Sequence, residues 1–137
     1  IALAAEMVGG VADVLDQTVS YIKQRKQFGR SVATFQAVQH KAADFLIDLE
    51  RARTAVYYAA AVADEEPENL AKAASMAKAA ANQAYTEGSK KAIQLHGGIG
   101  FTWEQDLHLY LRRAKSCEYI FGDTNWHLDR LAHGLGI

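Results

Sequence analysis

Residues 68–95, ENLAKAASMAKAAANQAYTEGSKKAIQL, decide the fold of this chain. The segment contains no proline and is rich in Ala and Lys, so its composition favours a helix. Small side chains on one face would let neighbouring backbones approach closely, and we therefore expect this helix to lie inside a bundle. The small and apolar residues that recur at helical spacing on that face are Leu70, Ala73, Ala77, Ala80, Ala84, Gly88 and Leu95.

Two further helices are predicted before this segment. The first starts at the beginning of the chain with an apolar stripe and ends near Phe28-Gly29, where glycine can adopt the left-handed conformation that stops a helix. The second follows Thr34, its expected N-cap, and runs to about Ala63. Both are 25 to 30 residues long, or roughly 40 Å at 1.5 Å per residue.

A fourth helix is expected over residues 104–117 and a short fifth helix after Thr124. The connections between the predicted helices are short, and short connections force neighbouring helices to run antiparallel. The predicted fold class is therefore all-α: an antiparallel up-down four-helix bundle with a short extra C-terminal helix.

Length, composition and charge limit the classes of function. A chain of 137 residues that is 50% apolar fits one domain with a packed core. Its 15 basic and 16 acidic residues give a net charge of -1, which predicts no nucleic-acid partner and no basic membrane-binding face. No apolar run reaches the roughly 20 residues of a membrane span. The single Cys117 forms no internal disulfide, so we expect a cytoplasmic or matrix-like reducing compartment.

The first residues predict a domain of a larger protein. Ile1-Ala2-Leu3 opens directly on the apolar stripe of a helix, without an initiating Met and without a Ser, Thr, Asp or Asn cap. We expect the chain to begin in mid-helix.

No metal site is predicted. Helical bundles that hold two iron ions use inward Glu residues and Glu-x-x-His pairs, and this chain has no Glu-x-x-His. His40 and Asp44 are four residues apart on a predicted helix, but two ligands are too few for a metal centre.

Two motifs each allow a structural and a functional interpretation. Gly97-Gly98-Ile99-Gly100 follows a helix, whereas the dinucleotide-binding glycine motif follows a strand, so it is either a helix stop or a backbone exposed for close contact with a ligand. The cations of residues 21–30 either stabilise a helix C-terminus or bind phosphate through forked guanidinium groups such as those of Arg25 and Arg30.

Read in order along the chain, the motifs resemble the C-terminal helical domain of the acyl-CoA dehydrogenase family. The matching segments are Tyr21-x-x-x-Arg25-x-x-Phe28-Gly29, Phe35-Gln36, AIQLHGGIGF at residues 92–101 and RRAK at residues 112–115. The resemblance covers essentially all of residues 1–137. It implies that the N-terminal helical and middle β domains of such proteins lie outside this chain.

The resemblance implies a flavin cofactor and a thioester substrate. Members of this family bind FAD between subunits of a tetramer and oxidise acyl-CoA to 2-enoyl-CoA; a carboxylate takes the α-proton while a hydride leaves the β-carbon for the flavin. For this chain, the resemblance implies an acyl-CoA substrate and a separate electron acceptor. It also implies a homo- or hetero-oligomer, either a dimer or a tetramer. By this resemblance, Arg25 would contact the FAD diphosphate of a neighbouring subunit. The residues it assigns to the cofactor are Arg25, Phe28, Phe35, Gln36, Gln94, Leu95, Gly97 and Gly98.

The catalytic base of the family has no counterpart in its usual place. Many members carry a glutamate in an aromatic-Glu-Gly-Thr segment before the last helix, and the corresponding residues 120–124 are Ile-Phe-Gly-Asp-Thr. Phe121 or Gly122 takes the glutamate's position, depending on whether the glycines or the threonines are aligned. Asp123 is the only local candidate base, and we expect it to cap the last helix instead. Another branch of the family supplies the base from just ahead of Ile1.

Three functions remain open from the sequence. In the first, the chain is the FAD-contacting and oligomerisation domain of an acyl-CoA dehydrogenase and is inactive by itself. Alternatively, it belongs to a non-catalytic subunit that completes the flavin site of its partner in a mixed tetramer. The third possibility is a helical interaction module without FAD, which the retained Arg25, Gln36 and residues 94–98 disfavour.

Overall fold

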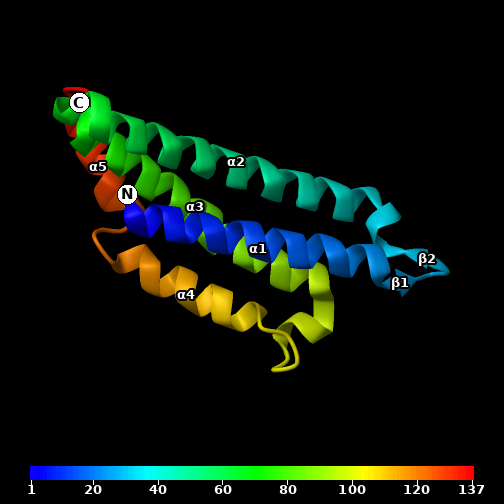
Figure 1. Cartoon of the computed structure of the whole chain (residues 1–137). Coiled ribbons are helices and arrows are strands. Elements are labelled where there is room, and N and C mark those ends of the chain that lie inside the picture. The colour runs from blue at the N-terminus through cyan, green and yellow to red at the C-terminus, as the bar shows by residue number, and fades with distance from the viewer.

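The computed structural model describes residues 1–137 and confirms the predicted all-α class (Figure 1). Three long helices lie side by side, and two shorter ones pack along them. A small hairpin and three short 3-10 helices connect them. The elements are α1 (Ala2–Gln24), β1 (Lys26–Gln27), β2 (Arg30–Ser31), η1 (Val32–Thr34), α2 (Gln36–Glu65), η2 (Pro67–Asn69), α3 (Leu70–His96), η3 (Gly97–Phe101), α4 (Leu107–Tyr119) and α5 (Thr124–Gly134).

Helix α3 is the centre of the bundle, as its small-residue face predicted. It packs against all four of the other helices. Ala73, Ala77 and Ala84 are buried on it. Gly88 gives the clearest reason for small residues, because a Cβ atom there would lie 2.3 Å from the ring of Phe45. Phe45 of α2 is the largest fully buried side chain, and the missing side chain of Gly88 makes room for its ring.

The end of the first helix differs from the prediction. Helix α1 ends at Gln24, and residues 28 and 29 form the tip of the hairpin between β1 and β2. Both tip residues have positive φ angles, 52° for Phe28 and 77° for Gly29, as two-residue hairpin turns require. Strands of two residues are too short to produce an alternating pattern, so the sequence contains no signal for this hairpin.

The predicted cap of the second helix is also wrong. Thr34 belongs to η1, and its hydroxyl donates a hydrogen bond of 2.7 Å to the carbonyl oxygen of Ser31. Helix α2 instead starts after Phe35, and no side chain caps its first turn. The expected cap of the last helix is confirmed, because the Asp123 carboxylate accepts a hydrogen bond of 2.8 Å from the backbone N–H of Trp126.

None of the helices combines the length and the hydropathy that crossing a bilayer requires.

Candidate cofactor site

A hollow lies at the end of the bundle that carries the hairpin. It has a volume of about 590 Å³ and is formed by the end of α1, the start of α2 and the junction of α3 with η3. The residues that line it are Tyr21, Arg25, Gln27, Val32, Ala37, Val38, Lys41, Gln94, Leu95, His96, Gly97, Gly98 and Ile99. We call this hollow the hairpin-end pocket.

The pocket brings together five of the eight residues that the sequence assigned to a cofactor: Arg25, Gln94, Leu95, Gly97 and Gly98. Arg25 and Gln94 are 69 positions apart in the chain, so the fold makes this site from distant segments. The other three predicted residues do not line it. Phe28 is 91% exposed at the hairpin tip and packs edge-on against Phe35 with ring centroids 6.2 Å apart, and Gln36 is exposed at the start of α2.

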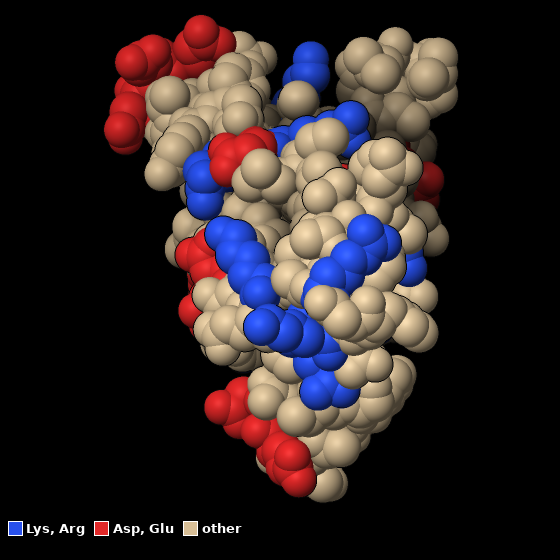
Figure 2. All heavy atoms as spheres, turned by 90° about the vertical axis from the view of Figure 1, so that its right-hand side faces the viewer, with Lys and Arg blue, Asp and Glu red and all other residues tan.

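The charges around the pocket are all positive. No Asp or Glu lines it, and none occurs anywhere between Asp16 and Asp44. Figure 2 shows Lys and Arg side chains across the middle of this end of the molecule, with Asp and Glu mainly towards the margins. Arg25 and Lys41 are the cations that line the pocket, whereas the guanidinium of Arg30 lies over the Phe35 ring at 4.1 Å from its centroid. The electrostatics therefore suit an anion.

Glycines form one wall of the pocket. Gly97 ends α3 with a φ angle of 66°, a conformation that other residues rarely adopt. Gly98 needs a different explanation, because a Cβ atom there would meet nothing within 4 Å in this chain. Its bare backbone faces open space at the pocket, where a ligand can approach closely. Gly100, in contrast, is required by packing, since a Cβ atom would lie 2.6 Å from the carbonyl oxygen of Ile93.

His96 and Tyr21 form the floor where α1 and α3 meet. Their rings are stacked with centroids 4.2 Å apart, and the Tyr21 hydroxyl donates a hydrogen bond to the carbonyl oxygen of His96. Burial lowers the pKa of His96, while a hydrogen bond with the carbonyl oxygen of Ala92 opposes the shift. A neutral imidazole therefore fits this site, and the positive charge of the pocket comes from Arg25 and Lys41.

Lys41 also lines the pocket, and it is not among the residues predicted from the sequence. It follows the Phe35-Gln36 pair by about one helical turn, and it faces the pocket because α2 passes beside the ends of α1 and α3. The only available signal was a lysine near the start of a helix that begins with the Phe35-Gln36 pair of the resemblance.

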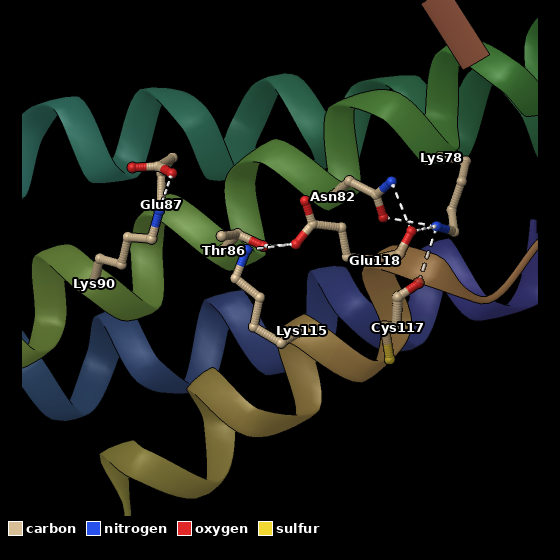
Figure 3. Close-up of polar contacts among 8 residues, drawn as sticks. All are labelled: Lys78, Asn82, Thr86, Glu87, Lys90, Lys115, Cys117 and Glu118. Carbon is tan, nitrogen blue, oxygen red and sulfur yellow. Dashed lines mark hydrogen bonds and ion pairs between the residues drawn. The ribbon is translucent and has the colours of Figure 1, made fainter. Parts of the chain in front are cut away.

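The segment that the resemblance aligned with the family's glutamate, residues 120–124, lies at the opposite end of the bundle (Figure 1). A buried lysine, Lys78, contacts this segment and the end of α4, and Figure 3 shows its contacts with α4. Lys78 of α3 is only 5% exposed, and its ammonium group donates hydrogen bonds to the carbonyl oxygens of Cys117 (3.0 Å), Glu118 (3.3 Å) and Gly122 (3.1 Å). The same ammonium group donates a hydrogen bond of 2.7 Å to the side-chain oxygen of Asn82. Lys78 thereby satisfies carbonyl groups that the end of α4 leaves without helical partners.

At position 122, one of the two positions aligned with the family's glutamate, the backbone conformation and a neighbouring ring disfavour any side chain. Gly122 has a φ angle of 102°, and a Cβ atom there would lie 2.6 Å from the indole of Trp126. Phe121 has a φ angle of 63° and points outward, 80% exposed. The Glu118 carboxylate lies one turn earlier and pairs with Lys115 at 2.7 Å. Asp123, the candidate base, uses its carboxylate to cap α5.

A second hollow, of about 560 Å³, lies beside this segment. Leu3, Leu70, Phe121 and Trp126 give it mainly apolar walls, and Arg130 lies at the same site with its guanidinium 5.4 Å from the Trp126 ring centroid. It could accommodate an apolar group.

The His, Cys, Asp and Glu side chains form no cluster of three or more that could hold a metal ion. His40 and Asp44 are both exposed on α2.

Known proteins have similar sequences and the same fold. The family model for the acyl-CoA dehydrogenase C-terminal domain matches residues 1–136. Acyl-CoA dehydrogenase IpdE2 of Mycobacterium tuberculosis is 44% identical over 131 residues, which cover 96% of this chain and 39% of that protein. Two solved structures superpose with 28% identity: PigA with FAD and proline, with a TM-score of 0.92 over 98% of this chain and 35% of that one, and the ChsE4-ChsE5 complex from Mycobacterium tuberculosis, with a TM-score of 0.91 over 98% and 36%.

The chain thus spans about two fifths of the length of the curated relative IpdE2. The match runs from the first residue to the last but one, so it includes the whole bundle and the hairpin-end pocket with Arg25 and the 97–100 glycine segment. This chain belongs to the acyl-CoA dehydrogenase family, as its C-terminal domain.

Proposed function

We propose that this chain is the FAD-contacting and oligomerisation domain of a flavin-dependent acyl-CoA dehydrogenase. The hairpin-end pocket is the observation that supports the proposal. An arginine without an ion-pair partner and an open glycine backbone line it, and no acidic side chain does. Those are the features that a diphosphate needs from a protein. FAD, when bound, accepts the hydride that leaves the β-carbon of the acyl group.

The pocket residues have different tasks in this proposal. The guanidinium of Arg25 binds diphosphate oxygens as a fork, and the backbone at Gly97 and Gly98 allows close approach of the cofactor. Phe28, Phe35 and Gln36 lie outside the pocket at the same end of the bundle, so they would contact a part of FAD that extends past it. Gln94 and Leu95 contribute the remaining wall.

The base that removes the α-proton comes from outside residues 1–137 in this proposal. Neither position aligned with the family's glutamate holds a carboxylate, since position 121 is Phe and position 122 is Gly, and the Asp123 carboxylate caps α5. We infer that the domain by itself does not catalyse dehydrogenation. The apolar hollow beside Phe121 suits one side of an acyl group, whose remaining contacts would come from other parts of the protein.

FAD content tests the proposal. The complete protein that carries this chain should purify with FAD, and Arg25→Ala should weaken FAD retention roughly tenfold or more, since a charge-assisted contact of this kind contributes about 1.5–3 kcal/mol. Arg51→Ala is the matched control, because Arg51 is an exposed arginine of α2 that lines no part of the hairpin-end pocket. Absence of FAD from the wild-type protein would refute the proposal, and equal retention by both variants would refute the role of Arg25.

A second candidate is a non-catalytic subunit that completes a partner's flavin site in a mixed tetramer. The closed geometry at Gly122 favours it, and the related structure of ChsE4-ChsE5 is a complex of two proteins. A dimer or tetramer is expected in both cases, because α2 exposes Leu46, Ile47, Tyr57 and Tyr58 beside Met76 of α3. Sedimentation at tens of micromolar would reveal the assembly, and a clean monomer would contradict it. Co-purification of a second subunit type separates the two candidates.

A helical interaction module without FAD is the third candidate. Two unpaired cations and a bare glycine backbone around one pocket have no use in such a module. We therefore rank it below the two flavin-binding candidates.

A further inference from the structure

Arg25 and Lys41 face one pocket from two different elements. Arg25 directly follows α1, and Lys41 lies in the second turn of α2. Neither side chain has a carboxylate within 4.0 Å, because the ion pairs of the chain involve only other residues. Neither side chain donates a hydrogen bond within the chain either. Two like charges at one hollow repel each other, and an anion bound between them would offset this repulsion.

The other cations of this region do not share the arrangement. Lys23 and Lys26 are exposed and do not line the hairpin-end pocket, and Arg30 lies over the ring of Phe35. Lys41, in contrast, is half-buried and lines the hairpin-end pocket. Arg25 and Lys41 are thus the two cations that line the pocket, whereas the other cations only make this end of the molecule basic.

The start of α2 adds to the positive potential. Helix α2 has no side-chain cap, and the N–H groups of Gln36 and Ala37 have no acceptor in the chain. Ala37 itself lines the pocket. The first turn of a helix carries a partial positive charge, which stabilises an anion placed beside it.

We propose that Lys41 binds the diphosphate of FAD together with Arg25. Arg25 would hold phosphate oxygens as a planar fork, and Lys41 would act as a compact point charge from the facing helix. This proposal rests on FAD being the ligand of the hairpin-end pocket, and it adds a residue that lies outside the recognised cofactor motifs. Coenzyme A also contains a diphosphate, so the experiment must distinguish the two nucleotides.

The experiment measures the dissociation constant of FAD from the complete apoprotein, at low and at high salt. Lys41→Gln should raise that constant roughly tenfold at low salt, as expected for the loss of one charge-assisted contact. The increase should shrink at high salt, because salt screens the interaction that the variant has lost. Lys41→Arg should restore most of the affinity, and Lys41→Met provides a second neutral variant that keeps the apolar stem.

Lys26→Gln is the matched control, since it removes the same charge from the neighbouring hairpin without changing the pocket lining. It should change the dissociation constant of FAD by less than about twofold. The dissociation constant of coenzyme A should be the same in all variants. An equal effect of Lys26→Gln, an unchanged FAD affinity in both neutral Lys41 variants, or an effect on coenzyme A instead of FAD would overturn the assignment. A wild-type protein that binds no FAD would refute the proposed function itself.

Discussion

The ammonium group of Lys78 lies 3.1 Å from the carbonyl oxygen of Gly122, and this contact joins the central helix α3 to the loop before α5. The same group bonds the carbonyl oxygens of Cys117 and Glu118 near the end of α4. Burial lowers the pKa of Lys78, and the nearby Cys117, Glu118 and Asp123 oppose the shift. One buried side chain thus holds the junction of three helices.

Replacing this lysine should loosen the junction locally. Lys78→Met keeps the apolar stem but removes the hydrogen bonds from the ammonium group to three carbonyl oxygens, so the free energy of local opening at residues 117–123 should fall by about 3 kcal/mol. Hydrogen exchange of this segment in the complete protein measures the change. Lys72→Met, at an exposed position of the same helix, should change it by less than about 0.5 kcal/mol. Unchanged exchange in Lys78→Met would show that the contact is not needed.

Alanine substitutions of Gly98 and Gly100 should have different effects, one on FAD affinity and the other on stability. Gly98→Ala adds a methyl group to open space, so we expect a melting temperature close to that of the wild type and an FAD affinity reduced roughly tenfold by the blocked approach of the cofactor. Gly100→Ala places the methyl group against the backbone of Ile93 and should cost about 1–3 kcal/mol of stability. Thermal unfolding and FAD titration distinguish the two effects. Unaltered FAD affinity in Gly98→Ala would argue against backbone contact there.

Stability should fall on mild acidification. Burial lowers the pKa values of His96 and His127 below the ordinary value of 6.5, and the charge of Lys78 lowers that of His127 further. Between the lowered pKa and 6.5, the unfolded chain binds more protons than the folded one, so the free energy of unfolding decreases as the pH falls below 6.5. The decrease ends once the pH is below the folded-state pKa values.

Denaturant unfolding at several pH values measures how steeply the free energy of unfolding changes with pH. A variant with both histidines replaced by glutamine should lose much of the pH dependence just below 6.5, whereas replacement of the exposed His40 should leave it unchanged. A slope that is the same in all three proteins would contradict the assignment.

Asp123 should be needed for the helix cap and not for proton removal. Asp123→Asn retains a capping oxygen for the Trp126 N–H, so the complete protein should keep most of its dehydrogenation rate. Asp123→Ala should destabilise α5 by about 1 kcal/mol with a comparable rate in the folded protein. A loss of about a thousandfold in turnover of Asp123→Asn, with FAD still bound, would make Asp123 the base.

Much of the fold could be predicted because its signals are local. The apolar spacing of residues 68–95 and the small residues Ala77 and Gly88 place α3 in the core, and the structure confirms this. Asp123 could be recognised as a cap because a cap needs only its own helix. The hairpin could not, since it depends on positive φ angles at both Phe28 and Gly29, and Phe28 is not a residue type that signals such a conformation.

The site divides in the same way. The sequence by itself determined that Arg25 and the Gly97-Gly98 pair match motifs of the acyl-CoA dehydrogenase family, because motif residues keep their order along the chain, and their contact with a cofactor stays a prediction. Only the tertiary structure decided which cations share a pocket: Arg25 and Lys41 line it, while Arg30 turns to Phe35. That outcome depends on the reversal of the chain at the hairpin and on the rotation of α2 about its axis. Neither is encoded in residue spacing, because both are set by how three helices pack together.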